Sequence, residues 1–199
     1  MHAATIQPAF HDAAREAQAV FRTVMEAMAR PGRILRLEPG FTPPPFLNAT
    51  AAAILLALAD FETPIWLDSV LSAARPVTEF LRFHTGARIV ERADAAHFAL
   101  IADCLKAPPL TAFAQGTPDY PDLGATVIFQ VETLQPRGWT LAGPGIDGEA
   151  AFGAWPVPSN LAMQFAENRT RFPLGVDILF AGQNEIAALP RSVRLTEAS

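Results

Sequence analysis

Apolar residues recur every three to four positions between residues 10 and 29, which is the spacing of one face of an α-helix. The sequence RPGR at 30–33 ends this predicted helix, because proline disfavours helical backbone in the residue before it and glycine suits a helix exit. The run AAAILLALA at 51–59 predicts a second helix, capped by Asn48 or Thr50. Since that run is apolar on every side, we expect the second helix to be buried.

Short apolar runs bounded by turn residues predict the strands. The strongest is 125–134, whose centre is rich in β-branched and aromatic residues, and 137–143 is expected to pair with it as a hairpin. Two more strands, 176–182 and 185–195, are separated by the turn GQNE. Shorter elements are predicted elsewhere: strands at 33–37, 64–67 and 87–91, and helices at 76–83 and, with Ser159 as its cap, 159–169.

Helices and strands alternate in the first half of the chain, and hairpins gather in the second half. The segment 93–115 is ambiguous between helix and strand, since 97–102 is compatible with a strand and 108–115 with a short helix. A turn-rich loop is predicted at 116–124. A mixed sheet covered by helices on both faces would bury such a set of elements. No repeat or linker interrupts the chain, so we predict one domain over 1–199, of the three-layer α/β/α class.

The composition is apolar for a chain of this size. Half of the 199 residues are hydrophobic and 18% are charged, against roughly 25% charged residues in ordinary domains. The surplus apolar surface predicts a subunit interface, and a high alanine content is the simpler alternative. The longest apolar run, 51–59, falls well short of the roughly 20 residues that cross a bilayer, so no membrane span is predicted.

The N-terminal sequence, the cysteine content and the charge indicate the cellular compartment and the kinds of partner to expect. The N-terminus lacks a basic start followed by an apolar block, so no signal peptide is expected. A single cysteine, Cys104, cannot form an internal disulfide and fits a reducing cytoplasm, where we interpret it as a small hydrophobe rather than a nucleophile. The net charge is −5 and the basic residues are scattered, so nucleic-acid binding is not expected.

The turn GPGIDG at 143–148 has the G-x-G-x-x-G spacing of a dinucleotide-binding loop. Such loops aim several backbone N–H groups at one anion from the start of a helix. Here Pro144 has no N–H, no Gly-Lys-Ser/Thr follows, and 149–158 is not expected to be helical. We therefore interpret Gly143 and Gly145 as structural turn residues that allow tight geometry or the close approach of another segment.

No catalytic or metal-binding residue can be assigned from local motifs. The four histidines lack metal-ligand spacing among themselves or with carboxylates, and no G-x-S-x-G elbow is present. The only lysine, Lys106, lies in a loop beside two prolines and is a poor candidate for the Schiff base of a pyridoxal phosphate enzyme.

Two short segments gather cationic side chains. LRFHTGAR contains Arg82, His84 and Arg88, and ENRTRFPLG contains Arg169 and Arg171. Either segment could bind an anion such as a phosphonate or a triphosphate, since guanidinium groups form charge-assisted hydrogen bonds with phosphoryl oxygens. Solvated or interface arginines are the alternative interpretation.

Seven motifs, in order along the chain, resemble the signatures of one family. They are FRTVMEAMARPGRI (21–34), LLALADFETPIWL (55–67), LRFHTGA (81–87), GATVIFQVETL (124–134), LAGPGI (141–146), FPLGVDILF (172–180) and LPRS (189–192). Together they resemble the PhnH family, a component of the carbon–phosphorus lyase system of phosphonate metabolism, over about residues 10 to 192.

The resemblance implies a fold similar to the large domain of pyridoxal-phosphate-dependent transferases, without that cofactor. It also implies a homodimer in isolation and a core complex with partner subunits G, I and J. That system uses an alkylphosphonate and MgATP, and the phosphonate displaces adenine from the ribose C1 to give a ribose 1-alkylphosphonate 5-triphosphate. Radical chemistry belongs to another component, and one cysteine could not hold an iron–sulfur cluster that needs three or four thiolates.

Two roles remain open at this point. The first is an accessory subunit that binds no cofactor and stabilises or completes the assembly through protein contacts. The alternative is an enzyme component whose dimer supplies an anion site for the phosphonate or ATP. Its candidate contacts are Arg82, His84 and Arg191, which lie within the family motifs, and Arg169 and Arg171, which lie just outside them.

Overall fold

A computed structural model describes residues 9–197. Residues 1–8, with His2 among them, and 198–199 lie outside the described part, so the structure does not bear on the expectation of no signal peptide. The helices are α1 (Ala13–Ala29), α2 (Ala49–Leu58), α3 (Ser69–Ala73), α4 (Arg75–Thr85) and α5 (Leu161–Thr170). The strands are β1 (Leu35–Arg36), β2 (Ile65–Leu67), β3 (Ile89–Val90), β4 (Phe98–Ile101), β5 (Thr126–Gln130), β6 (Thr133–Ala142), β7 (Ala150–Trp155), β8 (Asp177–Ala181), β9 (Glu185–Leu189) and β10 (Arg194–Thr196). Four 3-10 turns complete the set: η1 (Ala93–Ala95), η2 (Cys104–Lys106), η3 (Leu110–Ala112) and η4 (Pro121–Leu123).

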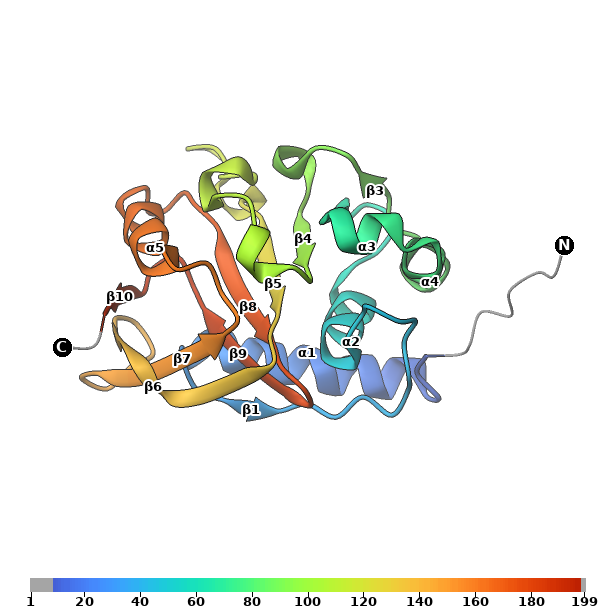
Figure 1. Cartoon of the computed structure of the whole chain (residues 1–199), viewed down its shortest axis with the longest axis horizontal. Helices are drawn as coiled ribbons and strands as arrows, with labels where there is room; N and C mark the ends of the chain where they lie inside the picture. Colours follow the sequence, from blue (N-terminus) through green and yellow to red (C-terminus); the bar gives the residue numbers. More distant parts are fainter. Residues whose placement is uncertain (1–8, 198–199) are drawn as a thin grey trace, which may run out of the picture.

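The central element is a seven-stranded mixed sheet in the order β1-β9-β8-β5-β4-β2-β3 (Figure 1). Strands β3, β2, β4, β5 and β8 are parallel, whereas β9 runs antiparallel to both β8 and β1. A second, antiparallel sheet has the order β10-β6-β7. The mixed α/β class predicted from the alternation of elements is therefore confirmed.

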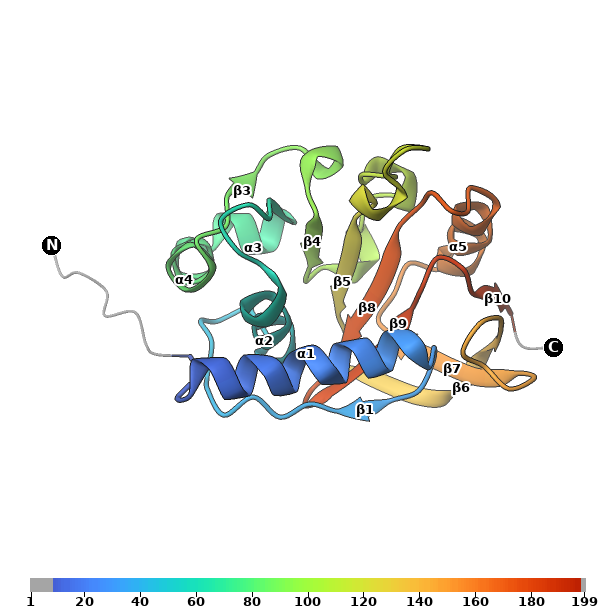
Figure 2. The ribbon, with the colours of Figure 1, turned by 180° about the vertical axis from the view of Figure 1, so that it is seen from behind.

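Two hydrophobic clusters cover the two faces of the large sheet. Leu100 and Ile128 point into a cluster with α1, α2 and α4, while their neighbours Ile101 and Phe129 point into a cluster with α5 and the small sheet. Because side chains alternate across a strand, residues that are apolar on both sides require cover on both faces. Figures 1 and 2 show α1 lying along one side and the small sheet on the other. The predicted α/β/α class expects helices alone on each face of the large sheet. On one face, however, the small sheet β10-β6-β7 packs beside α5.

The two helices predicted from the N-terminal patterns are confirmed. Helix α1 starts where Asp12 accepts a hydrogen bond from the backbone N–H of Arg15, three residues inside the predicted start at residue 10. The cap of α2 is Asn48, whose side chain accepts from the N–H of Ala51 at 2.6 Å. Residues 50–55 of α2 are all buried, as its uniformly apolar sequence predicts.

Three predictions for the second half of the chain are wrong. The stretch 125–134 divides between β5 and β6, and β6 pairs with β7 rather than with β5, because β4 and β8 already occupy both edges of β5. The stretch 185–195 divides at Pro190 into β9 and β10, which belong to different sheets. Ser159 is not the cap of α5, which begins after Asn160 without a side-chain cap.

The ambiguous segment 93–115 resolves into one strand and short turns. Its residues 98–101 form β4, in agreement with the strand interpretation. The expected short helix at 108–115 is only the three-residue turn η3. The loop at 116–124 is present as predicted and carries η4.

Thr50 is buried in α2, and its hydroxyl has no hydrogen-bond partner within the described chain. A buried polar group without a partner costs about 1 to 3 kcal/mol. We therefore predict that Thr50→Val, which keeps the shape and removes the hydroxyl, raises the free energy of unfolding by about 1 kcal/mol in urea titrations.

Thr85 provides the matched control in α4. Its hydroxyl donates to the carbonyl of Leu81 and accepts from the N–H of Ala87. Thr85→Val should lower the free energy of unfolding by about 1 kcal/mol. An equal loss of stability in both variants would contradict this assignment.

Candidate functional site

Arg191, one of the candidate anion contacts, forms an ion pair with Asp177. The guanidinium Nη2 lies 2.6 Å from Asp177 Oδ2, and Nε lies 3.2 Å from both carboxylate oxygens. The backbone N–H of Arg191 also donates to Oδ1 at 2.7 Å. The two side chains are only 11% and 16% exposed, so the pair lies largely out of solvent. A pair in such a position requires further hydrogen bonds to offset the lost hydration of both charges.

The remaining donors of Arg191 supply those bonds. Nη1 donates to the carbonyl oxygens of Pro121 at 2.8 Å and Pro173 at 3.4 Å, and Nη2 reaches that of Gly124 at 3.5 Å. These carbonyls belong to two loops that come before β5 and before β8. With Nε, Nη1 and Nη2 all bonded within the protein, the guanidinium has no group left over for an external anion.

The same two loops also contact each other directly. The N–H of Gly175 donates to the carbonyl of Gln115 at 2.9 Å. A Cβ at Gly124 would overlap the carbonyl oxygen of Gly175 and the guanidinium of Arg191, so only glycine fits there. We refer to residues 115–124 and 171–175, joined in this way by Arg191, as the stapled loops.

Arg169 and Arg171 lie close to this arrangement, at the end of α5. The Nε of Arg169 donates to the carbonyl of Ser192 at 3.3 Å, and Arg171 pairs with Glu167 at 3.1 Å. Both arginines are exposed. The chain therefore places Arg169, Arg171 and Arg191 in one region.

Arg82 and His84 occupy the last turn of α4, elsewhere in the molecule. Helix α4 packs against the cluster that contains α1 and α2, whereas α5 packs against the opposite face of the sheet. The ring of His84 lies 4.5 Å from that of Phe80 and 5.0 Å from that of Phe83. Within one copy of the chain, the five candidate contacts thus form two separate groups.

The glycine-rich turn at 143–148 packs against the end of α1. Gly145 has φ +82°, and a Cβ there would overlap the carbonyl oxygen of Ala29. Gly143 has φ +143° and passes beside Val193. The segment that follows is strand β7, so no helix N-terminus lies behind the turn to bind a phosphate.

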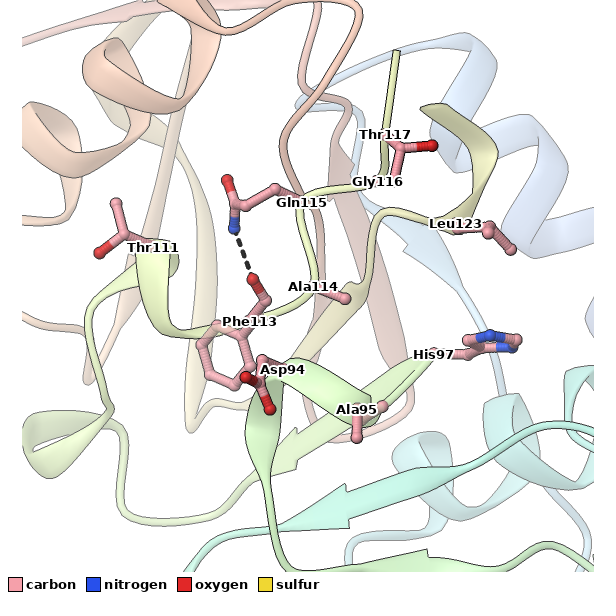
Figure 3. A pocket seen from close by; sticks show the side chains of 11 residues that line it. Asp94, Ala95, His97, Thr111, Phe113, Ala114, Gln115, Gly116, Thr117 and Leu123 are labelled. Atoms are coloured by element: carbon pink, nitrogen blue, oxygen red, sulfur yellow. Dashed lines mark hydrogen bonds between the residues drawn. The ribbon is translucent and has the colours of Figure 1, made fainter. Parts of the chain in front are cut away.

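A depression of about 480 Å³ lies at the amino ends of β4 and β5, against the loop 115–124 (Figure 3). Its polar lining includes His97, Thr111 and Gln115, and its apolar lining includes Phe113 and Leu123. In Figure 3 the Gln115 amide donates to the carbonyl of Phe113. None of the five predicted anion contacts lines this depression. No motif in the sequence marks its residues, because they come from separate turns.

The carboxyl ends of β2 and β4 are joined by the buried carboxylate of Asp68. It accepts hydrogen bonds from the N–H groups of Leu71 at 3.0 Å and of Ala102 and Asp103 at 2.8 Å. Cys104 is buried nearby, and burial together with the neighbouring carboxylates raises the pKa of its thiol to about 12. This environment suits the structural interpretation of Cys104, because a nucleophilic cysteine needs a lowered pKa.

Two further observations concern the part of the chain between residues 9 and 197. No group of three or more His, Cys, Asp or Glu side chains there is arranged to hold a metal ion. None of its helices has the length and apolarity needed to span a membrane.

Comparison with known proteins identifies the family. The model of the family described as "Bacterial phosphonate metabolism protein (PhnH)" matches residues 8–196. The chain is 36% identical over 189 residues to "Alpha-D-ribose 1-methylphosphonate 5-triphosphate synthase subunit PhnH" of Rhizobium meliloti (strain 1021), covering 94% of each protein. It is 30% identical over 186 residues to "Putative C-P lyase subunit protein HtxG" of Stutzerimonas stutzeri, covering 89% of this chain and 85% of that protein. The chain therefore belongs to the PhnH family of phosphonate metabolism, which confirms the resemblance carried by the seven motifs.

Removing the guanidinium of Arg191 should destabilise the fold. Loss of one partner leaves the other charge buried without compensation, which typically costs about 3 to 5 kcal/mol. We predict that Arg191→Ala lowers the free energy of unfolding by about 3 kcal/mol in urea titrations. Arg171→Ala breaks only an exposed pair and should change it by less than about 1 kcal/mol. Similar small effects from both substitutions would contradict the structural role of Arg191.

The raised pKa of Cys104 makes a prediction about thiol reactivity. At pH 8 only about one thiol in 10⁴ would be ionised in the folded protein, and the thiolate is the reactive form. Alkylation by iodoacetamide should therefore be at least about 100-fold slower in the native protein than in urea. Equal alkylation rates in the native protein and in urea would contradict the assignment.

The raised pKa of Cys104 also affects stability. Since the folded pKa is raised above the usual 9.0, the free energy of unfolding should fall as the pH rises from 9 toward 12.

Proposed function

We propose that this protein is a subunit of the bacterial carbon–phosphorus lyase system for organophosphonate catabolism. In that system it supports transfer of an alkylphosphonate to the ribose C1 of ATP, with displacement of adenine to form a ribose 1-alkylphosphonate 5-triphosphate. The observation that carries the proposal is the match to a synthase subunit along 94% of both proteins. A second relative bears the name of a C-P lyase subunit, which supports the same system.

The role proposed for this chain is mainly non-catalytic assembly. The predicted cationic contacts lie in two separate groups, and the donors of Arg191 are bonded to Asp177 and to backbone carbonyls. Such an arrangement stabilises loops and offers no convergent set of side chains for a phosphoryl group. We propose that alkylphosphonate, ATP and Mg²⁺ are bound by the assembly as a whole.

No cofactor, and in particular no pyridoxal phosphate, is proposed for this subunit. A Schiff-base lysine requires a lowered pKa. Lys106 instead donates to Asp103 at 2.8 Å, and this hydrogen bond raises its pKa. We nevertheless propose that the fold is that of the large domain of pyridoxal-phosphate-dependent transferases, which is supported by the seven-stranded mixed sheet.

The partners proposed are a second copy in isolation and subunits G, I and J in the complete assembly, all in the cytoplasm. Support comes from the surface of the described chain, where eleven large apolar side chains are at least 44% exposed. Among them Phe21 and Met25 lie one turn apart on the same face of α1, and neighbouring exposed apolar side chains mark protein–protein contact sites.

The alternative is an enzyme component whose dimer binds phosphonate or ATP through an arginine and histidine site. One observation favours it: Arg82, Arg169 and Arg171 are all exposed, so a second copy could bring the two separate groups together. Charge-assisted hydrogen bonds are worth about 1.5 to 3 kcal/mol each, so such a site should bind ligand measurably.

We predict that the tagged protein, co-expressed with subunits G, I and J, is recovered in one complex whose native mass includes all four proteins. The isolated protein should bind neither ATP nor methylphosphonate at millimolar concentration in calorimetry. Recovery of a homodimer without the other subunits would overturn the assembly role. Millimolar or tighter ligand binding that Arg82→Ala abolishes would support the alternative.

A further inference from the structure

The stapled loops carry three large apolar side chains on the surface. Tyr120 is 62% exposed, Leu123 44% and Phe172 60%. The first two lie in the loop 115–124 and the third lies in the loop 171–175. Figures 1 and 2 show these loops at the same end of the molecule, beyond β5 and α5.

The backbone that presents these side chains is held by hydrogen bonds. Thr117 and Tyr120 exchange two backbone hydrogen bonds, at 3.0 and 3.1 Å, and the Thr117 hydroxyl accepts a third from the N–H of Tyr120. Arg191 binds the carbonyls of Pro121 and Pro173, one residue from Tyr120 and one from Phe172. A surface ordered before binding loses less conformational entropy when a partner docks.

Large side chains in fixed positions are the usual anchors of a protein interface. Tyr is enriched among the residues that dominate binding energy, and Phe is enriched in interfaces generally. The depression of about 480 Å³ begins beside these anchors, since Leu123 and Gln115 line it. It offers a recess for a side chain of the partner.

The charge of this surface indicates the kind of partner. Asp119 and Asp122 flank Tyr120, are exposed, and form no ion pair with any described residue. Arg171, next to Phe172, is already paired with Glu167. A two-fold contact centred on the loop 115–124 would bring the aspartates of two copies together, which is unfavourable.

We propose that the stapled loops dock a different protein chain, whose contact face is apolar at its centre and carries Lys or Arg at its rim. This inference rests on the proposed function, because the partner would be another subunit of the assembly. The homodimer proposed above would use another part of the surface. Arg191 acts here as a positioning residue for the loops.

The test compares the double variant Tyr120→Ala/Phe172→Ala with wild type in co-expression with subunits G, I and J. We expect recovery of the complex from the double variant to fall at least about 10-fold, the effect of losing one interface anchor. Phe61→Ala is the matched control, since Phe61 is 70% exposed near the end of α4, and it should assemble as wild type does. Circular dichroism and urea unfolding should be the same for all three proteins.

A second double variant tests the charge of the partner. Asp119→Lys/Asp122→Lys should weaken binding of the purified protein to the complex of the other subunits by at least about 10-fold at low salt. The affinity of the wild type should fall as salt is raised from about 50 to 300 mM, and that of the charge variant should depend less on salt.

The outcomes separate this inference from the proposed function. Normal assembly of the Tyr120→Ala/Phe172→Ala variant would overturn the docking surface and leave the proposed function standing. Failure of the wild type to recover any of the other subunits would overturn both. Loss of the homodimer in that variant, with partner binding unchanged, would show that a second copy occupies the surface and would overturn the partner proposed here.

Discussion

Arg191 and Asp177 meet where four segments of the chain come together. Asp177 begins β8, Arg191 follows β9, and the guanidinium reaches carbonyls in the loop before β5 and in the loop after α5. Two charges so little exposed are tolerated because nearly all of their hydrogen-bonding groups are satisfied. The pair therefore holds together the loops before β5 and β8, at the amino ends of these strands, and with them the surface that the stapled loops form.

In this arrangement the side-chain donors of a motif arginine are all bonded within the protein. A guanidinium whose donors bind one carboxylate and several carbonyls has no capacity left for a phosphoryl oxygen. Membership of the PhnH family places the chain in phosphonate metabolism. Together these facts support the proposed role, in which the subunit contributes ordered contact surfaces to a larger enzyme. On that proposal Tyr120 and Phe172 would be contact residues, since both are exposed and the same arginine binds the backbone beside each.

The local sequence predicted what depends on local physics. The 3.6-residue period marks α1, the side chain of Asn48 caps α2, and Pro and Asp residues mark the loop at 116–124. Strand pairing was not predictable in the same way, since β5 lies between β4 and β8, which are distant in sequence. The division at Pro190 was missed because Val193 and Leu195 continue the apolar residues of 186–189 in a strand-like alternation, although a proline inside such a run usually marks a break.

The candidate site shows the same limit. Spacing grouped Arg82 with His84 and Arg169 with Arg171, but it contains no information on which face of the sheet each helix covers. Pro121, whose carbonyl accepts a hydrogen bond from Arg191, lies 70 residues away, so no local pattern could identify this contact between the loops. The family motifs did mark the arginine itself, although only the structure shows its hydrogen-bond partners.

Hydrogen–deuterium exchange on the free protein and on the protein in complex with the other subunits tests the central claim most directly. If the stapled loops are the contact surface, backbone amides in 115–124 and 171–175 should exchange more slowly in the complex, while those at the end of α4 around Arg82 keep their free rate. Unchanged exchange in the stapled loops, with new protection around Arg82 and His84, would contradict the account.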